Sequence, residues 1–139
     1  TTPGGHLQAY QDIDIVLDTF PWSGHTTTCE ALWMGVPVVT LRGDRHAARM
    51  GASLMTHLGL NDWIAASATE YVDLAARMAA DLPRLSELRA TLRQRLLSSP
   101  ICDGPRFAAA VEAAFRAMWQ RWCDGRDSSG LDNTKADIS

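Results

Sequence analysis

Short apolar runs dominate the first half of the chain, and apolar residues at helical spacing dominate the second half. The runs at residues 13–18 and 36–41 are typical of strands buried on both faces of a parallel sheet. Residues 26–34 lie between them and predict a helix that ends at Gly35 in a left-handed conformation. This succession predicts a βαβ crossover, and residues 63–65 predict a further short strand. The predicted fold class is therefore α/β, with a parallel sheet flanked by helices and a helical C-terminus.

Several helices are predicted outside the crossover. Asp44 is the expected N-cap of a helix that runs to about residue 57, with Gly59 just beyond its end. Pro83 is expected to end a helix over residues 68–82, because proline cannot continue a helix. The apolar stripe of that helix comprises Tyr71, Leu74, Ala75, Met78 and Leu82. The others are expected at residues 6–11 and 85–97, the latter with a stripe of Leu85, Leu88, Leu92 and Leu96.

The last predicted helix carries Pro105 in its first turn, where the fixed φ of proline is already helical. Its apolar residues recur at helical spacing as Phe107, Val111, Phe115, Met118 and Trp122. That face requires a partner surface, which we expect on a neighbouring lobe. From Asp124 to Ser139 the apolar content is too low to offset the entropy of ordering. We therefore expect one lobe over residues 1–123 and a disordered tail over 124–139.

Composition excludes several classes of function. The chain has 139 residues, 46% of them hydrophobic, and a net charge of -3, and its arginines are scattered. No basic stripe is present, so nucleic acid is not an expected partner. No apolar run is long enough to span a bilayer. The three cysteines show neither disulfide nor zinc spacing, which favours a reducing cytoplasm. A start without Met suggests the C-terminal piece of a larger protein.

The run Thr26-Thr27-Thr28 carries the sharpest chemical signal. It stands where a helix begins after a parallel strand, and the N–H groups and dipole of such a helix attract anions. Gly24 permits close approach of the backbone, and the hydroxyls suit a diphosphate. Helix capping alone is the alternative explanation of the threonines. The dipole contributes only about 0.3–2 kcal/mol, so useful binding needs several hydroxyl and amide hydrogen bonds.

Glu30 lies one helical turn after Thr26 and is suited to accept the hydroxyls of a ribose. A solvent-exposed helix acid is the alternative. His6 and His25 flank the first strand, and either is a candidate ligand contact or general base, or else a surface histidine. His46 and His57 have no partners at metal-ligand spacing and receive no role.

Acidic residues flank the first strand and are candidate metal ligands. Asp12-Ile13-Asp14 resembles the DxD pattern of some glycosyltransferases, yet it lies at the amino end of the strand, away from the proposed crevice. We therefore expect no metal site. Asp18 lies at the correct end, where a single acid more often accepts hydrogen bonds from local backbone.

Five segments together resemble the C-terminal catalytic lobe of the TPR-containing O-linked N-acetylglucosamine transferases and their bacterial homologues. They are residues 6–10, 14–21, 23–27, 32–40 and 98–100, and the distances between them also match. The resemblance covers about residues 1–123. It implies a Rossmann-like lobe of a GT-B glycosyltransferase, whose upstream lobe and repeats receive the acceptor protein.

The resemblance also implies an activity and a set of site residues. The family transfers N-acetylglucosamine from UDP-GlcNAc to Ser or Thr with inversion, without metal or cofactor. His6 corresponds to a histidine near the uridine, and Glu30 stands where the family often has Asp on the ribose. His25, Thr26 and Thr27 correspond to the diphosphate loop, and the two threonines are expected to stabilise the leaving group. Residues 1–3 and Leu7, Gln8 and Ala9 are expected to line the nucleobase.

Two departures keep the donor open. Animal members have Lys at the position of Pro3 and Arg at that of Ala9, so base contacts must differ here. The SPINDLY branch of the family uses GDP-fucose and tends to lack a histidine at position 25, so His25 favours UDP-GlcNAc. The alternatives are a GT-B enzyme with GDP-fucose or another donor, and a non-catalytic nucleotide-sugar-binding lobe. The diphosphate-binding lysine and the general base of the family belong to sequence upstream of Thr1.

Overall fold

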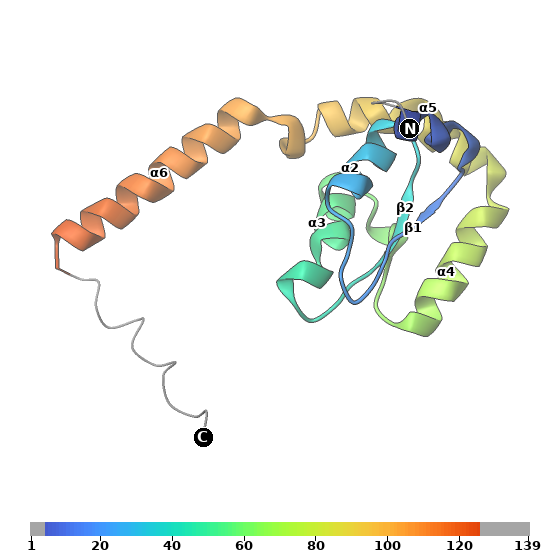
Figure 1. Ribbon diagram of the computed structural model, residues 1–139, viewed down its shortest axis with the longest axis horizontal. Coiled ribbons are helices and arrows are strands. Elements are labelled where there is room, and N and C mark those ends of the chain that lie inside the picture. Colours follow the sequence, from blue (N-terminus) through green and yellow to red (C-terminus); the bar gives the residue numbers. More distant parts are fainter. Residues whose placement is uncertain (1–4, 126–139) are drawn as a thin grey trace, which may run out of the picture. The chain divides into compact units, whose positions relative to one another are not determined.

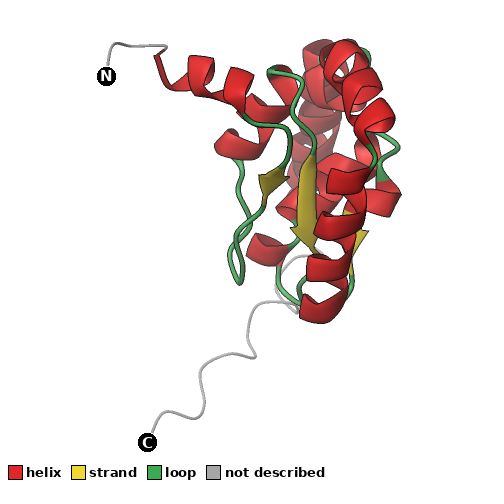
Figure 2. Cartoon of the chain, turned by 90° about the vertical axis from the view of Figure 1, so that its right-hand side faces the viewer, coloured by secondary structure: helices red, strands yellow, loops and turns green. Residues whose placement is uncertain are grey.

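A parallel three-stranded sheet forms the centre of the fold. The computed structural model describes residues 5–125. Strands β1 (Val16–Leu17), β2 (Val38–Leu41) and β3 (Ile64–Ala65) run in the order β1-β2-β3, with Val16 opposite Val38 and Thr40 opposite Ile64. Figure 2 shows the strands pointing the same way. The carboxyl ends of all three strands therefore meet at one edge, as predicted.

Helices cover both faces of this sheet. In Figure 1, α2 and α3 lie on one side of the strands and α4 lies on the other. The elements before the sheet are α1 (Gly5–Gln8) and the 3-10 turn η1 (Ala9–Asp12). The remaining helices of this part are α2 (Thr26–Trp33), α3 (Met50–His57), α4 (Ala68–Ala80) and α5 (Leu82–Leu97). Three more 3-10 turns are η2 (His46–Ala48), η3 (Asn61–Trp63) and η4 (Pro100–Cys102).

Local signals for several helix ends are confirmed. Gly35 follows α2 at φ +82°, and a Cβ there would lie 2.7 Å from the carbonyl oxygen of Arg89. Gly59 follows α3 at φ +71°. The Ser67 hydroxyl, for which no prediction was made, caps α4 by accepting from the N–H of Glu70 at 3.1 Å. These ends are set by neighbouring residues, so the sequence predicts them well.

The core lies between β2 and the helices. Val38 and Val39 of the central strand are fully buried, and the leucine stripe of α5, Leu85, Leu88, Leu92 and Leu96, is buried as predicted. The prediction that the first strand is buried on both faces is wrong, since Leu17 is 57% exposed. Within residues 5–125, β1 is an edge strand paired only with β2.

Two predicted helix boundaries are also wrong. Asp44 does not cap α3, because the chain first forms η2 and the Arg49 guanidinium donates to the carbonyl oxygens of Gly43 at 2.9 Å and Asp44 at 3.1 Å. Leu82 does not extend the α4 stripe and is 70% exposed.

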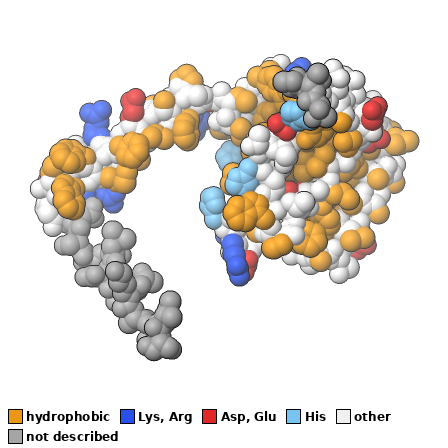
Figure 3. Space-filling model, viewed as in Figure 1, with side chains coloured by type: hydrophobic (Ala, Val, Ile, Leu, Met, Phe, Trp, Pro, Cys, Tyr) orange, Lys and Arg blue, Asp and Glu red, His pale blue; other side chains and the backbone are white. Residues whose placement is uncertain are grey.

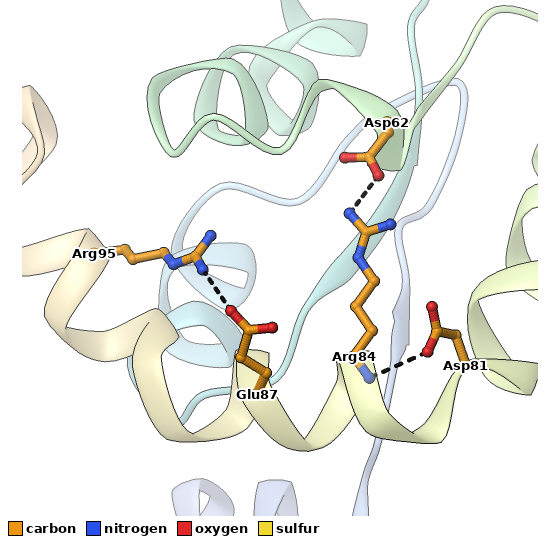
Figure 4. A network of polar contacts seen from close by, with 5 residues as sticks. All are labelled: Asp62, Asp81, Arg84, Glu87 and Arg95. Atoms are coloured by element: carbon orange, nitrogen blue, oxygen red, sulfur yellow. Dashed lines mark hydrogen bonds and ion pairs between the residues drawn. The ribbon is translucent and has the colours of Figure 1, made fainter.

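The connection between α4 and α5 explains why Leu82 does not belong to α4. Asp81 ends α4 and caps α5 by accepting from the N–H of Arg84 at 3.2 Å, so Pro83 begins a helix and does not end one. Figure 4 shows this cap, together with the Arg84 ion pair to Asp62 and the Arg95–Glu87 pair at 3.4 Å.

By its contacts the chain divides into two compact units, Thr1–Cys102 and Asp103–Ser139. In the second unit, α6 (Gly104–Cys123) carries Pro105 in its first turn, as predicted. Its apolar stripe is exposed along the helix (Figure 3), with Phe107, Phe115 and Trp122 at 64–69%. No helix within residues 5–125 is both long and apolar enough to cross a membrane. The tail predicted from Asp124 lies outside the described residues from position 126 onward.

Candidate functional site

The loop between β1 and α2 ends in an open helix N-terminus. The side chains of Thr26 and Thr27 are exposed, whereas Thr28 is only 2% exposed. The first hydrogen bond of the helix runs from the N–H of Cys29 to the carbonyl oxygen of His25 at 3.1 Å, and the His25 side chain does not cap the helix. The N–H groups of the three threonines therefore have no partner within the helix, and two hydroxyls stand beside them.

Gly24 brings the loop close to these threonines. A Cβ at this position would lie 2.6 Å from Oγ1 of Thr28 and 2.8 Å from Oγ1 of Thr27. The predicted approach of this backbone to a diphosphate stays a prediction, while the structure shows that the threonine hydroxyls already lie close to Gly24. The loop therefore has room for glycine only.

A buried polar cluster lies directly behind this turn. Asp18 is 6% exposed, and its Oδ1 accepts from the N–H of Gly24 at 2.7 Å. Its Oδ2 accepts from the Thr40 hydroxyl at 2.7 Å, and its carbonyl oxygen accepts from the Tyr71 hydroxyl, also at 2.7 Å. The expected bond to local backbone is thus present. The links to Thr40 and Tyr71 join residues far apart in the chain, and the sequence carried no signal for them.

His6 and Glu30 are brought together, although 24 positions separate them. His6 Nε2 lies 3.3 Å from Glu30 Oε1, with the histidine side chain 60% and the glutamate side chain 28% exposed. His25 has a different partner, since its ring stacks on exposed Trp22 with centroids 6.5 Å apart. The two histidines therefore stand with separate neighbours.

A pocket of about 300 Å³ adjoins the start of α2. Its lining combines predicted site residues with apolar ones: Leu7, Thr26, Cys29, Glu30, Trp33, Leu96, Ile101 and Cys102. The predicted nucleobase residues Gln8 and Ala9 are exposed and do not line this pocket, while residues 1–3 lie outside the described part of the chain. The surface of the cavity is almost wholly apolar, although Thr26 and Glu30 are among its lining residues, so it can accommodate a flat apolar or aromatic group.

Tyr10 is a neighbour of the site that the sequence reasoning missed. Its hydroxyl donates to the carbonyl oxygen of Thr27 at 3.3 Å, which ties η1 to the first turn of α2. Burial, and then the charge of Glu30, raise the pKa of this phenol, so it stays a neutral donor at physiological pH. The Cys29 thiol pKa is also raised, first by burial and then by Cys102 and Glu30.

The acids at the amino end of β1 are not gathered into a metal site. Asp12 and Asp14 are exposed, and Asp14 Oδ1 lies 3.9 Å from Nη2 of Arg89. Within residues 5–125, no group of three or more His, Cys, Asp or Glu side chains is arranged to hold a metal ion. The chemistry available at the α2 N-terminus is hydrogen bonding to an anion by hydroxyl and N–H groups.

Comparison with known proteins points to one family. The sequence profile of Glycosyl transferase family 41 matches residues 3–111. A Hordeum vulgare protein named probable UDP-N-acetylglucosamine–peptide N-acetylglucosaminyltransferase SPINDLY is 52% identical over 91% of this chain and 13% of its own length. An Arabidopsis thaliana protein of the same description, but named SEC, is 34% identical over 87% of this chain and 12% of its own length.

A solved structure gives the same result for the fold. A mutant of the Thermobaculum terrenum O-GlcNAc transferase superposes with a TM-score of 0.82 at 43% identity, over 90% of this chain and 24% of that one. The predicted fold class, an α/β Rossmann-like lobe of the GT-B type, is confirmed by this match and by the parallel sheet. The chain spans about an eighth of the length of the curated relatives it matches, 13% for the barley protein.

Proposed function

The chain belongs to glycosyltransferase family 41, and we propose that it is the C-terminal, nucleotide-sugar-binding lobe of a two-lobed enzyme. This enzyme transfers N-acetylglucosamine from UDP-GlcNAc to Ser or Thr of proteins in the cytoplasm, with inversion and without metal or cofactor. An upstream lobe and TPR repeats complete the site and receive the acceptor. The observation that carries the proposal is the open α2 N-terminus, with the hydroxyls of Thr26 and Thr27 exposed beside unpartnered N–H groups.

The reaction builds negative charge on the departing diphosphate. The acceptor oxygen attacks the anomeric carbon as the bond to the β-phosphate oxygen breaks, and that bond's electron pair leaves with UDP. The hydroxyl proton passes to a base that we assign to the upstream lobe. Thr26, Thr27 and the helix N-terminus donate to the phosphate oxygens, and these bonds strengthen as the charge grows. Preorganised hydrogen-bond donors of this kind stabilise the charge of the leaving diphosphate, as a bound cation does in other transferases.

The remaining site residues suit the nucleoside. The Glu30 carboxylate accepts from the ribose hydroxyls, and the 3.3 Å contact with His6 orients it. The apolar pocket beside Leu7 takes the nucleobase. Gln8 and Ala9 lie next in the chain and contact the exposed edge of the base. His25, at the start of the diphosphate loop, contacts a phosphate oxygen.

Donor identity is tested by titrating UDP and GDP separately into the whole protein in a calorimeter, with EDTA present. UDP is expected to bind at least about 10-fold more tightly, a difference of roughly 1.4 kcal/mol. Tighter binding of GDP would overturn the choice of donor, and binding that requires a metal would overturn the metal-free mechanism.

The leaving-group role is tested with Thr27→Val, which removes the hydroxyl and keeps the shape, and with Thr27→Ser, which keeps the hydroxyl. A hydrogen bond to a charged group contributes about 1.5–3 kcal/mol, so the valine variant is expected to lose roughly 10- to 150-fold in kcat/KM. At saturating donor its kcat should fall as well, and the serine variant should retain most activity. An unchanged kcat in the valine variant would reject the role.

GDP-fucose is a second candidate donor, favoured by one observation. Relatives of 49–53% identity carry the name SPINDLY, and the resemblance to that branch implies GDP-fucose as donor, whereas the relative named SEC is 34% identical. A lobe that binds nucleotide without catalysis is the other alternative. Turnover of UDP-GlcNAc with peptide acceptors excludes it, and nucleotide binding without turnover of either donor favours it.

A further inference from the structure

We infer that Asp18 is a positioning residue that holds the Gly24–Thr28 turn in the shape the diphosphate requires. The inference rests on the proposed function for its ligand, but the positioning itself is a property of the free protein. Asp18 touches neither hydroxyl that faces the solvent, so it acts through the backbone of the loop.

The contacts place Asp18 between the strand ends and the turn. One carboxylate oxygen accepts from the N–H of Gly24 and the other from the Thr40 hydroxyl, each at 2.7 Å. Gly24 lies against Oγ1 of both Thr27 and Thr28, so a shift of its backbone moves the start of α2. A single side chain thereby couples the carboxyl ends of β1 and β2 to the anion-binding turn.

The surrounding backbone is shaped around this carboxylate. A Cβ on Gly51 would lie 2.3 Å from Oδ2 of Asp18 and 2.4 Å from Oγ1 of Thr40. Ser23 fixes the other side of the turn, because its hydroxyl donates to the carbonyl oxygen of Ala47 at 2.8 Å and its N–H donates to the same oxygen at 3.0 Å. The turn is therefore clamped between the β1 exit and the β2–α3 connection.

Asp18 is a buried acid held by neutral donors. No arginine, lysine or histidine within residues 5–125 forms an ion pair with it. Burying a carboxylate on neutral hydrogen bonds alone is unfavourable compared with an apolar side chain of similar size. This unfavourable arrangement directly behind the open helix N-terminus points to a function in orienting the turn.

An effect of the Asp18 charge and an effect of its hydrogen bonds on the turn would change anion binding in opposite directions. If the carboxylate acted mainly through its charge, its removal would strengthen diphosphate binding, because like charges repel. If it acts by position, loss of the hydrogen bonds weakens binding. Asp18→Asn separates the two effects: the amide oxygen can still accept from Gly24, and the amide nitrogen can donate to the Thr40 hydroxyl, which is also an acceptor.

The first test needs no ligand. Amide hydrogen exchange of the Gly24–Thr28 segment is followed in the whole protein, in the wild type, Asp18→Ala and Asp18→Asn. The alanine variant is expected to exchange the Gly24 amide at least about 10-fold faster, since its acceptor is gone. The asparagine variant should stay within about 3-fold of wild type. Equal protection of this amide in all three proteins would overturn the positioning role.

The second test measures UDP affinity and the split between KM and kcat. Asp18→Ala should weaken UDP roughly 10-fold and lower kcat, and Asp18→Asn should bind as the wild type does or more tightly. Met78→Ala is the matched control, because Met78 is buried in α4 and takes no part in the hydrogen bonds that Asp18 makes. It should lose stability and keep wild-type KM and kcat; a similar rise in KM in the control would assign the effect to stability and overturn the inference.

Thr40→Val covers the case in which the alanine variant does not fold. It removes one of the two donors and leaves Gly24 bonded, so UDP affinity and Gly24 protection should both fall to intermediate values. Wild-type values for both would overturn the inference. If the wild type binds no UDP, but amide exchange at Gly24 differs between the wild type and the Asp18 variants as described above, the proposed donor is rejected and the positioning role is retained.

Discussion

Gly24→Ala tests the most tightly packed point of the site. The added methyl carbon would lie 2.6 Å from Oγ1 of Thr28, 2.8 Å from Oγ1 of Thr27 and 3.3 Å from Oδ1 of Asp18. Thr27 is exposed and can rotate away, but Thr28 is 2% exposed and has no room. The backbone must therefore move away from the helix, and this movement breaks the bond between the Gly24 N–H and Asp18.

The magnitude follows from three effects. Overpacking of a buried contact destabilises by about 1–3 kcal/mol, and a buried acceptor left without its donor by about 1–3 kcal/mol. Alanine in place of glycine lowers the conformational entropy of the unfolded chain, which offsets the loss of stability by about 0.4–1 kcal/mol. The free energy of unfolding should fall by roughly 3 kcal/mol, with the helix start displaced and UDP binding weakened.

The assay is urea unfolding of the 139-residue chain followed by tryptophan fluorescence. With a slope of about 2 kcal/mol per molar urea, the midpoint should fall by roughly 1.5 M. Gly104→Ala is the matched control, since a Cβ there meets nothing within 4 Å and the residue begins α6. If both variants unfold at the same urea concentration, the packing argument for the loop is refuted.

Other predictions follow from buried or paired groups. Tyr71→Phe should lower the free energy of unfolding by about 1 kcal/mol. Burial, and then the charge of Asp18, raise the pKa of Tyr71 above 10.0. The stabilisation that the neutral phenol provides is therefore complete below about pH 10 and is lost as the pH rises through the pKa of the folded state. In urea unfolding at alkaline pH, the wild type should lose more stability than the phenylalanine variant. Asp62→Asn removes the exposed pair with Arg84 and should change the unfolding free energy by less than about 1 kcal/mol, which thermal melts in low and high salt will check. Iodoacetamide at neutral pH should alkylate exposed Cys102 faster than half-buried Cys29, whose thiol pKa is raised; mass spectrometry of timed samples showing the reverse order would contradict this.

Elements with strong local signals were predictable from the chain alone. The stripe of α5 and the central strand β2 follow from apolar spacing, and Gly35 and Gly59 follow from the left-handed conformation that ends a helix. The position of the threonine run at a helix start is equally local. These features depend on residues a few positions apart, so no knowledge of the fold is required.

Errors arose where a side-chain contact in the turn between two elements outweighed apolar spacing or capping preference. Leu82 has the spacing of the α4 stripe, but the Asp81 cap assigns it to the next helix. Asp44 is a good N-cap residue, yet the Arg49 guanidinium donates to the carbonyl oxygens of Gly43 and Asp44, and these hydrogen bonds hold a turn before α3 begins. Spacing and propensity describe one helix at a time, and these outcomes depend on how two successive elements are connected.

The sequence by itself determined the βαβ order, the helix faces, and the hydroxyls at the start of α2. Only the tertiary structure decided that Asp18 meets Thr40 and Tyr71, and that His6 meets Glu30. The physical reason is range: periodicity and capping act over one or two turns of chain, whereas these contacts join residues 22 to 53 positions apart that only the folded sheet and its helices bring together.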